Sequence, residues 1–334
     1  MARKNIMGAV TFFVLVVLTF FVIFKDNDMG QVFAAMQTLK SSYLAAAAAT
    51  ALLFTAAEGC MIWYLLNGLE DRAGFLSCLR YSFVGFFYSG ITPSASGGQP
   101  MQLYYMQKEG HRVSDSTVVL MMVALIYKFV LVMMGIGILI FYYEPLKFYL
   151  KDYRYLYYLG LFLNGALVAA LLFIMVSPTC FRRIVLGGEK ILKKIHLLKA
   201  SDSRTEKLMV MADQYHEAVL FLMGNKRKIL CVTGFTFLQR CSVFFMTWLI
   251  YQGMGLQGQS VISIMVLQAV VYISVDMLPL PGAQGITELM YKAAYAEVFS
   301  GAYLTASMCV TRGFNFYFLM IVSAGAALWS HLRN

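Results

Sequence analysis

The sequence is poor in charge and lacks the residue patterns of most enzymes. Only 13% of its 334 residues are Asp, Glu, Lys or Arg, about half the usual share of a soluble protein, and 60% are hydrophobic. It contains no GxSxG, HExxH or P-loop sequence, and its four histidines lie in predicted loops or at the C-terminal tail. These absences exclude an ordinary soluble domain, and we expect neither a catalytic site nor a cofactor in this chain.

Cysteine pairs and acidic residues are also scarce. The six cysteines include no CxxC pair and no histidine at ligand spacing, so neither a disulfide framework nor a zinc site is expected. The net charge is +10, and 11 of the 27 Lys and Arg residues lie between Arg182 and Lys228. Basic residues gathered in one loop are typical of the cytoplasmic face of a membrane protein, so we expect no nucleic-acid partner.

What the sequence does contain is long apolar runs. A helix of about 20 apolar residues crosses the hydrocarbon core of a bilayer, and mean hydropathy is +0.68. The sequence therefore predicts an all-α polytopic membrane protein. Its full spans are expected at residues 7–24, 43–66, 116–143, 155–177, 229–252 and 301–330. The first span follows Arg3 and Lys4 and lacks a small-residue cleavage site, which favours a retained signal anchor.

Two further apolar regions are interrupted by proline and glycine. The segment Thr92–Pro100 breaks residues 81–106, and the segment Leu278–Gly285 breaks residues 261–299. The arms of the first region are too short to cross separately, so we expect a re-entrant hairpin there. The arms of the second region fit either a hairpin or two crossings.

The charge distribution predicts the orientation and a repeat. With the N-terminus inside, 18 Lys and Arg residues are cytoplasmic and five are outside, so both termini are expected in the cytoplasm of a plasma-membrane protein. We interpret residues 1–334 as one transmembrane domain. Repeat 1, at about 43–143, and repeat 2, at about 229–330, are then inverted copies. Between them, residues 178–228 form a basic cytoplasmic segment.

A helix is expected in the second part of that cytoplasmic segment. Ser203–Glu206 has the spacing of a capping box, and apolar residues recur after it every three or four positions. These residues are Leu208, Met211, Tyr215, Val219 and Leu222. The helix would lie either on the inner leaflet or packed beneath the bundle.

Both breaks would place the start of a helix inside the membrane. Gln99 suits the cap and Pro100 the first position of a helix, which leaves the backbone N–H groups near Gly97 and Gly98 without acceptors. The N-terminus of a helix attracts anions, and phosphate fits such a site. The alternative is that the breaks are only kinks.

Six charged residues lie within apolar segments, three acidic and three basic. They are Glu58, Lys128, Arg240, Asp276, Glu288 and Arg312. Such charges must pair or face water. Arg240 and Arg312 suit a phosphate, whereas Glu288 is expected either to pair with Lys292 one turn later or to meet a substrate amine. Structural pairing alone explains the charges equally well.

The breaks and the buried charges together predict a substrate site between the repeats. The candidate binding residues are Glu58, Thr92, Pro93, Ser96, Gly97, Gly98, Gln99, Lys128, Arg240, Pro281, Gly282, Gln284, Gly285, Glu288 and Arg312. No metal ligand is among them.

Two motifs carry a resemblance to a known family. The segment Thr92–Pro100, with Leu103 and Tyr104, resembles the TPxxxGGEP-type motif of the lysylphosphatidylglycerol synthase transmembrane region, a flippase-like membrane family. The segment Pro279–Gly285 followed by Glu288 resembles its PxPGGxGxxE motif, and Arg312 and Gly325 match its last span. The resemblance covers nearly the whole chain, but Gln99 replaces the usual glutamate and Ala283 replaces a glycine.

The resemblance implies a function in lipid handling. Bifunctional members continue into a soluble domain that transfers lysine from lysyl-tRNA to phosphatidylglycerol, and such a domain does not follow within these 334 residues. We therefore expect a flippase-like transporter of anionic or aminoacylated phospholipid that works by alternating access. The alternatives are a membrane subunit related to phosphatidylglycerol lysyltransferase and an ion-coupled transporter of small solutes. A separate synthase or a second copy of the chain would be possible partners.

Overall fold

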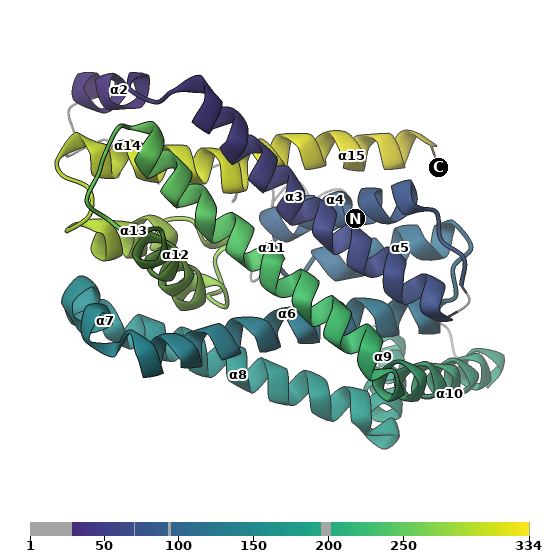
Figure 1. The fold of residues 1–334 in the computed structure, drawn as a ribbon. Helices are drawn as coiled ribbons and strands as arrows, with labels where there is room; N and C mark the ends of the chain where they lie inside the picture. The colour runs from purple at the N-terminus through teal and green to yellow at the C-terminus, as the bar shows by residue number, and fades with distance from the viewer. Residues whose placement is uncertain (1–28, 70, 93–94, 195–201, 334) are drawn as a thin grey trace.

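Helices form almost all of the described structure. The computed structural model describes residues 29–69, 71–92, 95–194 and 202–333, and within these ranges it contains helices and no strand (Figure 1). The predicted span at 7–24 lies outside the described residues. The expected all-α class is confirmed.

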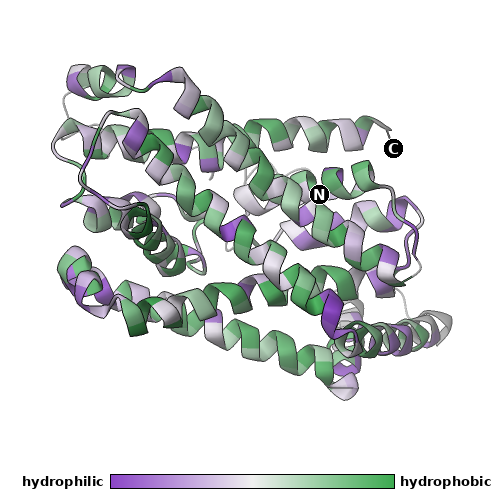
Figure 2. Ribbon diagram, viewed as in Figure 1, coloured by the Kyte–Doolittle hydropathy of each residue, from purple (hydrophilic) through white to green (hydrophobic). Residues whose placement is uncertain are grey.

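Five helical segments are long and apolar enough to cross a membrane. They are Ser41–Leu69, Val113–Phe141, Tyr143–Val176, Lys226–Gly253 and Ala302–Leu332. Each contains or closely matches one predicted span. Figure 2 shows mainly hydrophobic residues along these helices and hydrophilic residues in the connections. Large apolar side chains such as Leu53, Phe162 and Ile321 are exposed on the outside, as expected where helices face lipid.

The elements follow one another with short connections. The first half contains α2 (Met29–Gln37), α3 (Ser41–Leu66), η1 (Asn67–Leu69), α4 (Phe75–Ile91), α5 (Gly98–Lys108), α6 (Val113–Phe141), α7 (Tyr143–Leu150), η3 (Lys151–Tyr153) and α8 (Arg154–Val176). The second half contains α9 (Pro178–Lys194), α10 (Asp202–Gly224), α11 (Lys226–Gly253), α12 (Val261–Val275), η4 (Pro281–Ala283), α13 (Ile286–Tyr295), α14 (Ala302–Arg312), the π-helical η5 (Gly313–Phe318) and α15 (Leu319–Arg333).

The helices α3 and α11 form the central pair. They run antiparallel along each other (Figure 1), because Lys40 at the start of α3 donates its N–H to Gly253 at the end of α11. Near the middle, the Gln239 side chain of α11 donates to the carbonyl of Phe54 on α3. This pair therefore brings the charged residues of α3 and α11 to the same level of the bundle.

Small residues let α12 reach the bundle closely. A Cβ on Gly160 of α8 would overlap the carbonyl oxygen of Ile273 on α12, so these two helices meet backbone to backbone. Close approach at a small residue is a common way for membrane helices to pack. On the neighbouring side, the Tyr157 hydroxyl of α8 donates to the carbonyl of Gly135 on α6 at 2.8 Å. These contacts hold α12 next to α6 and α8.

The interrupted regions each fold as two packed helices. In the first, α4 and α5 are antiparallel, because Tyr81 lies beside Glu109 and Gly85 beside Gln102. In the second, α12 and α13 are antiparallel, because the Tyr295 hydroxyl donates to the carbonyl of Ile264 at 2.8 Å. The re-entrant placement of these pairs and the inverted repeat remain predictions.

The predicted cytoplasmic segment contains two helices. The expected helix is present as α10, and its Tyr215, Val219 and Leu222 are buried against the bundle. Burial raises the pKa of the Tyr215 hydroxyl, which donates to the Met121 sulfur at 3.3 Å. Of the two placements proposed for α10, packing beneath the bundle is therefore present. The helix α9 was not predicted.

Candidate functional site

An arginine enclosed by aromatic rings lies at the centre of the bundle. Arg240 of α11 is 1% exposed. Its guanidinium carbon lies 3.8 Å from the ring centroid of Tyr127, 4.4 Å from that of Phe54 and 5.5 Å from that of Tyr272. We call these four residues the aromatic–arginine cluster. They come from α11, α6, α3 and α12, so four helices meet there.

The hydrogen bonds of Arg240 leave part of its guanidinium unused. Nη1 donates to the Tyr127 hydroxyl at 2.9 Å, and Nη2 donates to Gln239 Oε1 at 3.4 Å. The buried Nε has no acceptor. Among the described residues, no carboxylate lies within ion-pair distance of this guanidinium. The cation is therefore desolvated and not neutralised by direct contact.

A carboxylate is held close to this cluster by a different group. Glu58 lies one turn after Phe54 on α3, so the two side chains share a face of that helix. Its Oε1 accepts a hydrogen bond from Gln102 Nε2 of α5 at 2.7 Å. Gln102 is 2% exposed and was not among the predicted residues. Its position three residues after Gln99, one turn along the same arm, is the only pattern that pointed to it.

A buried ion pair lies on the other side of the cluster. Lys128 of α6 is bonded to Asp276, which follows α12, and also contacts the Met277 sulfur at 3.3 Å. The adjacent Tyr127 and Tyr272 hydroxyls share a hydrogen bond of 2.7 Å. The helices α6 and α12 are thus joined twice, once by charges and once by tyrosines. Lys128 is satisfied by this pairing.

The first break turns back on itself at Thr92. The Thr92 hydroxyl donates to the carbonyl of Tyr88 at 2.7 Å and accepts from the N–H of Gly97 at 2.8 Å. The helix α5 begins at Gly98, with Gly97 as its cap, so the prediction that Gln99 is the cap and Pro100 the first helical residue was wrong by two positions. The reason is that the Thr92 hydroxyl, a partner outside the helix, fixes the N–H of Gly97.

Glycine is required where α5 starts. A Cβ on Gly98 would lie 2.7 Å from the carbonyl oxygen of Gly85 on α4. Ser96 and Gln99 are exposed, and Gln99 Nε2 donates to the carbonyl of Leu120 at 3.4 Å. Pro93 lies outside the described residues.

The second break is closed by a network around Arg312. Arg312 Nε donates to Glu288 Oε1 at 2.9 Å, and Nη2 donates to the carbonyl of Gly282 at 2.9 Å. Glu288 Oε2 accepts from the N–H of Gly285 at 2.7 Å. The expected pairing of Glu288 with Lys292 was therefore wrong. Arg312 comes from a distant helix, α14, and takes the carboxylate that local spacing assigned to Lys292.

The backbone of the second break is left-handed at several positions. Gly282, Ala283 and Gly285 have φ of 57°, 50° and 80°. Pro281 is buried, and Gln284 Oε1 accepts from the Tyr317 hydroxyl at 3.2 Å. Glu288 therefore already supplies a negative charge to the start of α13, at the place where the sequence predicted an external anion.

An aromatic ring lies between the two breaks. Phe316 of the π-helical segment contacts Gly282 and also the end of α4 at Gly90, where a Cβ would lie 3.5 Å from the ring. The same ring lies 4.7 Å from the Arg312 guanidinium. The breaks are thus close to each other, with a side chain between them at this point. A cavity shared by the two breaks remains a prediction.

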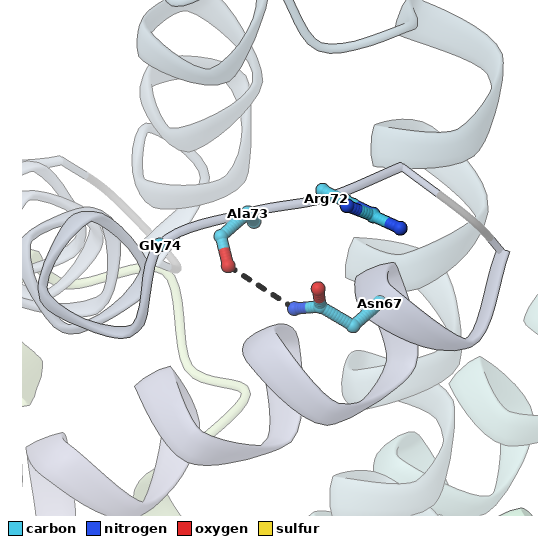
Figure 3. A pocket seen from close by; sticks show the side chains of 4 residues that line it. All are labelled: Asn67, Arg72, Ala73 and Gly74. Carbon is cyan, nitrogen blue, oxygen red and sulfur yellow. Dashed lines mark hydrogen bonds between the residues drawn. The ribbon is translucent and has the colours of Figure 1, made fainter.

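Cavities are present elsewhere in the molecule. One of about 860 Å³ lies between the end of α3 and the start of α4. Figure 3 shows its lining residues Asn67, Arg72, Ala73 and Gly74. Asn67 Nδ2 donates to the carbonyl of Ala73 at 3.2 Å, and none of the predicted site residues lines this cavity. In the described part of the chain, no group of three His, Cys, Asp or Glu residues is arranged to hold a metal ion.

Comparison with known proteins agrees with the resemblance seen in the motifs. No curated protein sequence matches the chain. The sequence model of the lysylphosphatidylglycerol synthase TM region matches residues 6–323, nearly the whole chain. A multi-pass helical bundle with both motifs at interrupted helices is consistent with this match. The chain belongs to the family of the lysylphosphatidylglycerol synthase TM region.

Proposed function

We propose that this protein binds the headgroup of an anionic or aminoacylated phospholipid, of the lysyl-phosphatidylglycerol type, and moves it between the leaflets. The aromatic–arginine cluster would hold the headgroup phosphate. The observation that carries the proposal is Arg240, which is buried in a membrane protein with an unused Nε and no carboxylate in contact.

The energetics of Arg240 favour an anionic guest. A charge at the centre of a bilayer costs at least about 2.5–3.5 kcal/mol on insertion scales. The three rings offset part of this cost, since a desolvated cation–π contact contributes roughly 2 kcal/mol. Rings stabilise a cation but do not neutralise it. A phosphate on Nε would do both, because a guanidinium binds phosphate with directed hydrogen bonds.

Glu58 supplies the complement for an aminoacylated headgroup. It stands on α3 one turn from Phe54, about 6 Å along the helix axis, and is bound by the neutral amide of Gln102. Separate positive and negative groups at one level of the bundle suit a headgroup that carries both a phosphate and an ammonium. Lys128 and Arg312 would then be structural, since each already has a carboxylate.

A lipid suits the bundle better than a soluble solute. The exposed faces of the long helices are apolar, so acyl chains would stay in the bilayer while only the headgroup enters the polar centre. Unassisted crossing is slow because the headgroup charges lose their water. The left-handed residues of the second break and the π-helical segment after Arg312 are the places where the helices would rearrange during alternating access.

The proposal includes the placement of the protein. We expect a plasma-membrane protein with both termini in the cytoplasm, which also places α9 and α10 on the cytoplasmic side. Protease protection of tags added at either end of the chain, in sealed inverted vesicles, tests this orientation.

Translocation in proteoliposomes tests the function. We expect wild type to move a labelled lysyl-phosphatidylglycerol between leaflets, and Arg240→Gln to slow this at least about tenfold, which corresponds to about 1.4 kcal/mol. Arg240→Lys should retain an intermediate rate. Arg112→Gln is the matched control, because that side chain is 76% exposed, and its rate should equal wild type. Equal rates for wild type, Arg240→Gln and empty liposomes would contradict the proposal.

The same preparation separates the two alternatives. Incorporation of labelled lysine into lipid in the presence of lysyl-tRNA would indicate a lysyltransferase-related subunit. Uptake of soluble amino acids or phosphate without lipid movement would indicate a solute transporter.

A further inference from the structure

An apolar groove lies between α7 and α12, away from the aromatic–arginine cluster. Its volume is about 400 Å³, within the usual range of small-molecule sites. The wall from α7 and its preceding residue contains Tyr142, Glu144, Pro145, Leu146, Phe148 and Tyr149. The wall from α12 contains Ser263, Val266, Leu267 and Val270. The spacing of the α12 residues places them along one face of that helix.

The groove lies where the end of a membrane span meets the headgroup layer. The helix α7 starts two residues after α6, and α6 has 29 residues, more than the roughly 20 that cross the hydrocarbon core. Next to the groove, Phe148 is 57% exposed and Ile262 is 54% exposed. Apolar side chains exposed on both rims indicate that the groove opens toward lipid and not toward water.

The two ends of the groove differ in polarity. Glu144 and Ser263 lie at one end, and Leu267 and Val270 lie further along α12. Beside the polar end, Lys147 lies 3.4 Å from Glu144 and 4.8 Å from the centroid of the Tyr143 ring. A cation above an apolar channel is complementary to a phospholipid, which carries a phosphate above acyl chains.

We propose that this groove binds one acyl chain of a glycerophospholipid whose phosphate pairs with Lys147. The chain would lie between Phe148 and Val266, with its end toward Val270. On α12, Tyr272 follows Val270 by two residues, and Asp276 lies about 9 Å further along the axis. The groove therefore gives a lipid lateral access to the polar centre. Only this access role rests on the proposed function.

Photolabelling tests whether a lipid occupies the groove. The full chain is reconstituted in nanodiscs with a phospholipid that carries a diazirine in the middle of one acyl chain, and the labelled peptides are mapped by mass spectrometry. We expect peptides 142–149 and 263–270 to be labelled about tenfold more than the lipid-facing surface around Phe162, which is 71% exposed. Labelling in proportion to exposure alone would overturn the proposal.

Substitutions that fill the groove provide the matched comparison. Val266→Trp should remove most of the label, whereas Ile262→Trp, one turn earlier on the exposed face, should leave it unchanged. Lys147→Gln, at a half-exposed position where folding is not at risk, should reduce labelling severalfold. Unchanged labelling in both Val266→Trp and Lys147→Gln would overturn the site.

Translocation measured in parallel separates the groove from the transport proposal. Slow translocation in Val266→Trp, with loss of the label, supports the access role. Loss of the label with wild-type translocation supports the binding site and overturns the access role. Persistent wild-type labelling in a protein that moves no lipid contradicts the proposed function and leaves the groove as a bound-lipid site.

Discussion

The two intramembrane arginines are treated in opposite ways by the same bundle. Arg312 is bonded to a carboxylate and to a backbone carbonyl, and that carboxylate also holds the N–H of Gly285. Arg240 has three aromatic rings, one tyrosine hydroxyl and an Nε without an acceptor. One charge is neutralised and fixed, and the other is only sheltered. This difference indicates which arginine is structural and which is available to a ligand.

The contrast also changes the meaning of the second break. Its helix start would be open to an anion by backbone geometry alone, but Glu288 already occupies that position from within the chain. A ligand there would have to displace an internal ion pair. At Arg240 a ligand would displace nothing charged.

The largest effect is expected from breaking the closed network. Arg312→Ala would leave Glu288 buried without its counter-charge, so we expect a loss of about 3–5 kcal/mol in stability. The double variant Glu288→Gln with Arg312→Met should recover much of this loss, because it removes both charges. Unfolding in mixed micelles measures both, and an unchanged free energy of unfolding for Arg312→Ala would show that the pair is not structural.

The support of Glu58 offers a smaller test. A Cβ on Gly85 would overlap the amide of Gln102, so Gly85→Ala should push Gln102 away from Glu58 at a cost of about 1–3 kcal/mol. Gly234→Ala is the control, because a Cβ there meets nothing within 4 Å. Thermal unfolding of the two variants compares them, and equal midpoints would mean that Gln102 moves aside freely.

Removing the sheltered cation should cost little stability. Replacing Arg240 by Met removes a charge that has no carboxylate in contact, so the lost contacts are offset by the lost desolvation penalty. We expect a change in the free energy of unfolding within about 1 kcal/mol, together with loss of lipid translocation. A loss as large as that of Arg312→Ala would place both arginines in the structural class.

The smallest effect is expected at the first break. Gln99 is exposed, and its bond to the Leu120 carbonyl is long at 3.4 Å, so Gln99→Glu should change stability by less than about 0.5 kcal/mol. Thermal unfolding again measures this. A larger loss would show that the family position filled here by Gln99 is part of the fold.

Local patterns predicted the features that depend on local chemistry. Apolar length gave the spans within the described residues, and proline with glycine gave both interruptions. The helix α10 was expected from apolar spacing between Leu208 and Leu222, and it is present. The helix α9 was missed, because Gly187 and Gly188 and the basic residues around them are typical of a loop until the apolar face has a partner.

Partners between distant helices were beyond the reach of the sequence. The six intramembrane charges were identified, but spacing favoured Glu288 with Lys292, whereas the fold places Arg312 beside Glu288. Likewise, Phe54, Tyr127 and Tyr272 each look like ordinary apolar positions of their spans. Only the packing of α3, α6, α11 and α12 brings them around one guanidinium.

An experimental structure in nanodiscs that contain lysyl-phosphatidylglycerol tests the central claim most directly. We predict a headgroup phosphate within about 3 Å of the guanidinium of Arg240, with Nε as one of its donors. A guanidinium that keeps only its aromatic rings, or that pairs directly with Glu58 while lipid binds elsewhere, would contradict it.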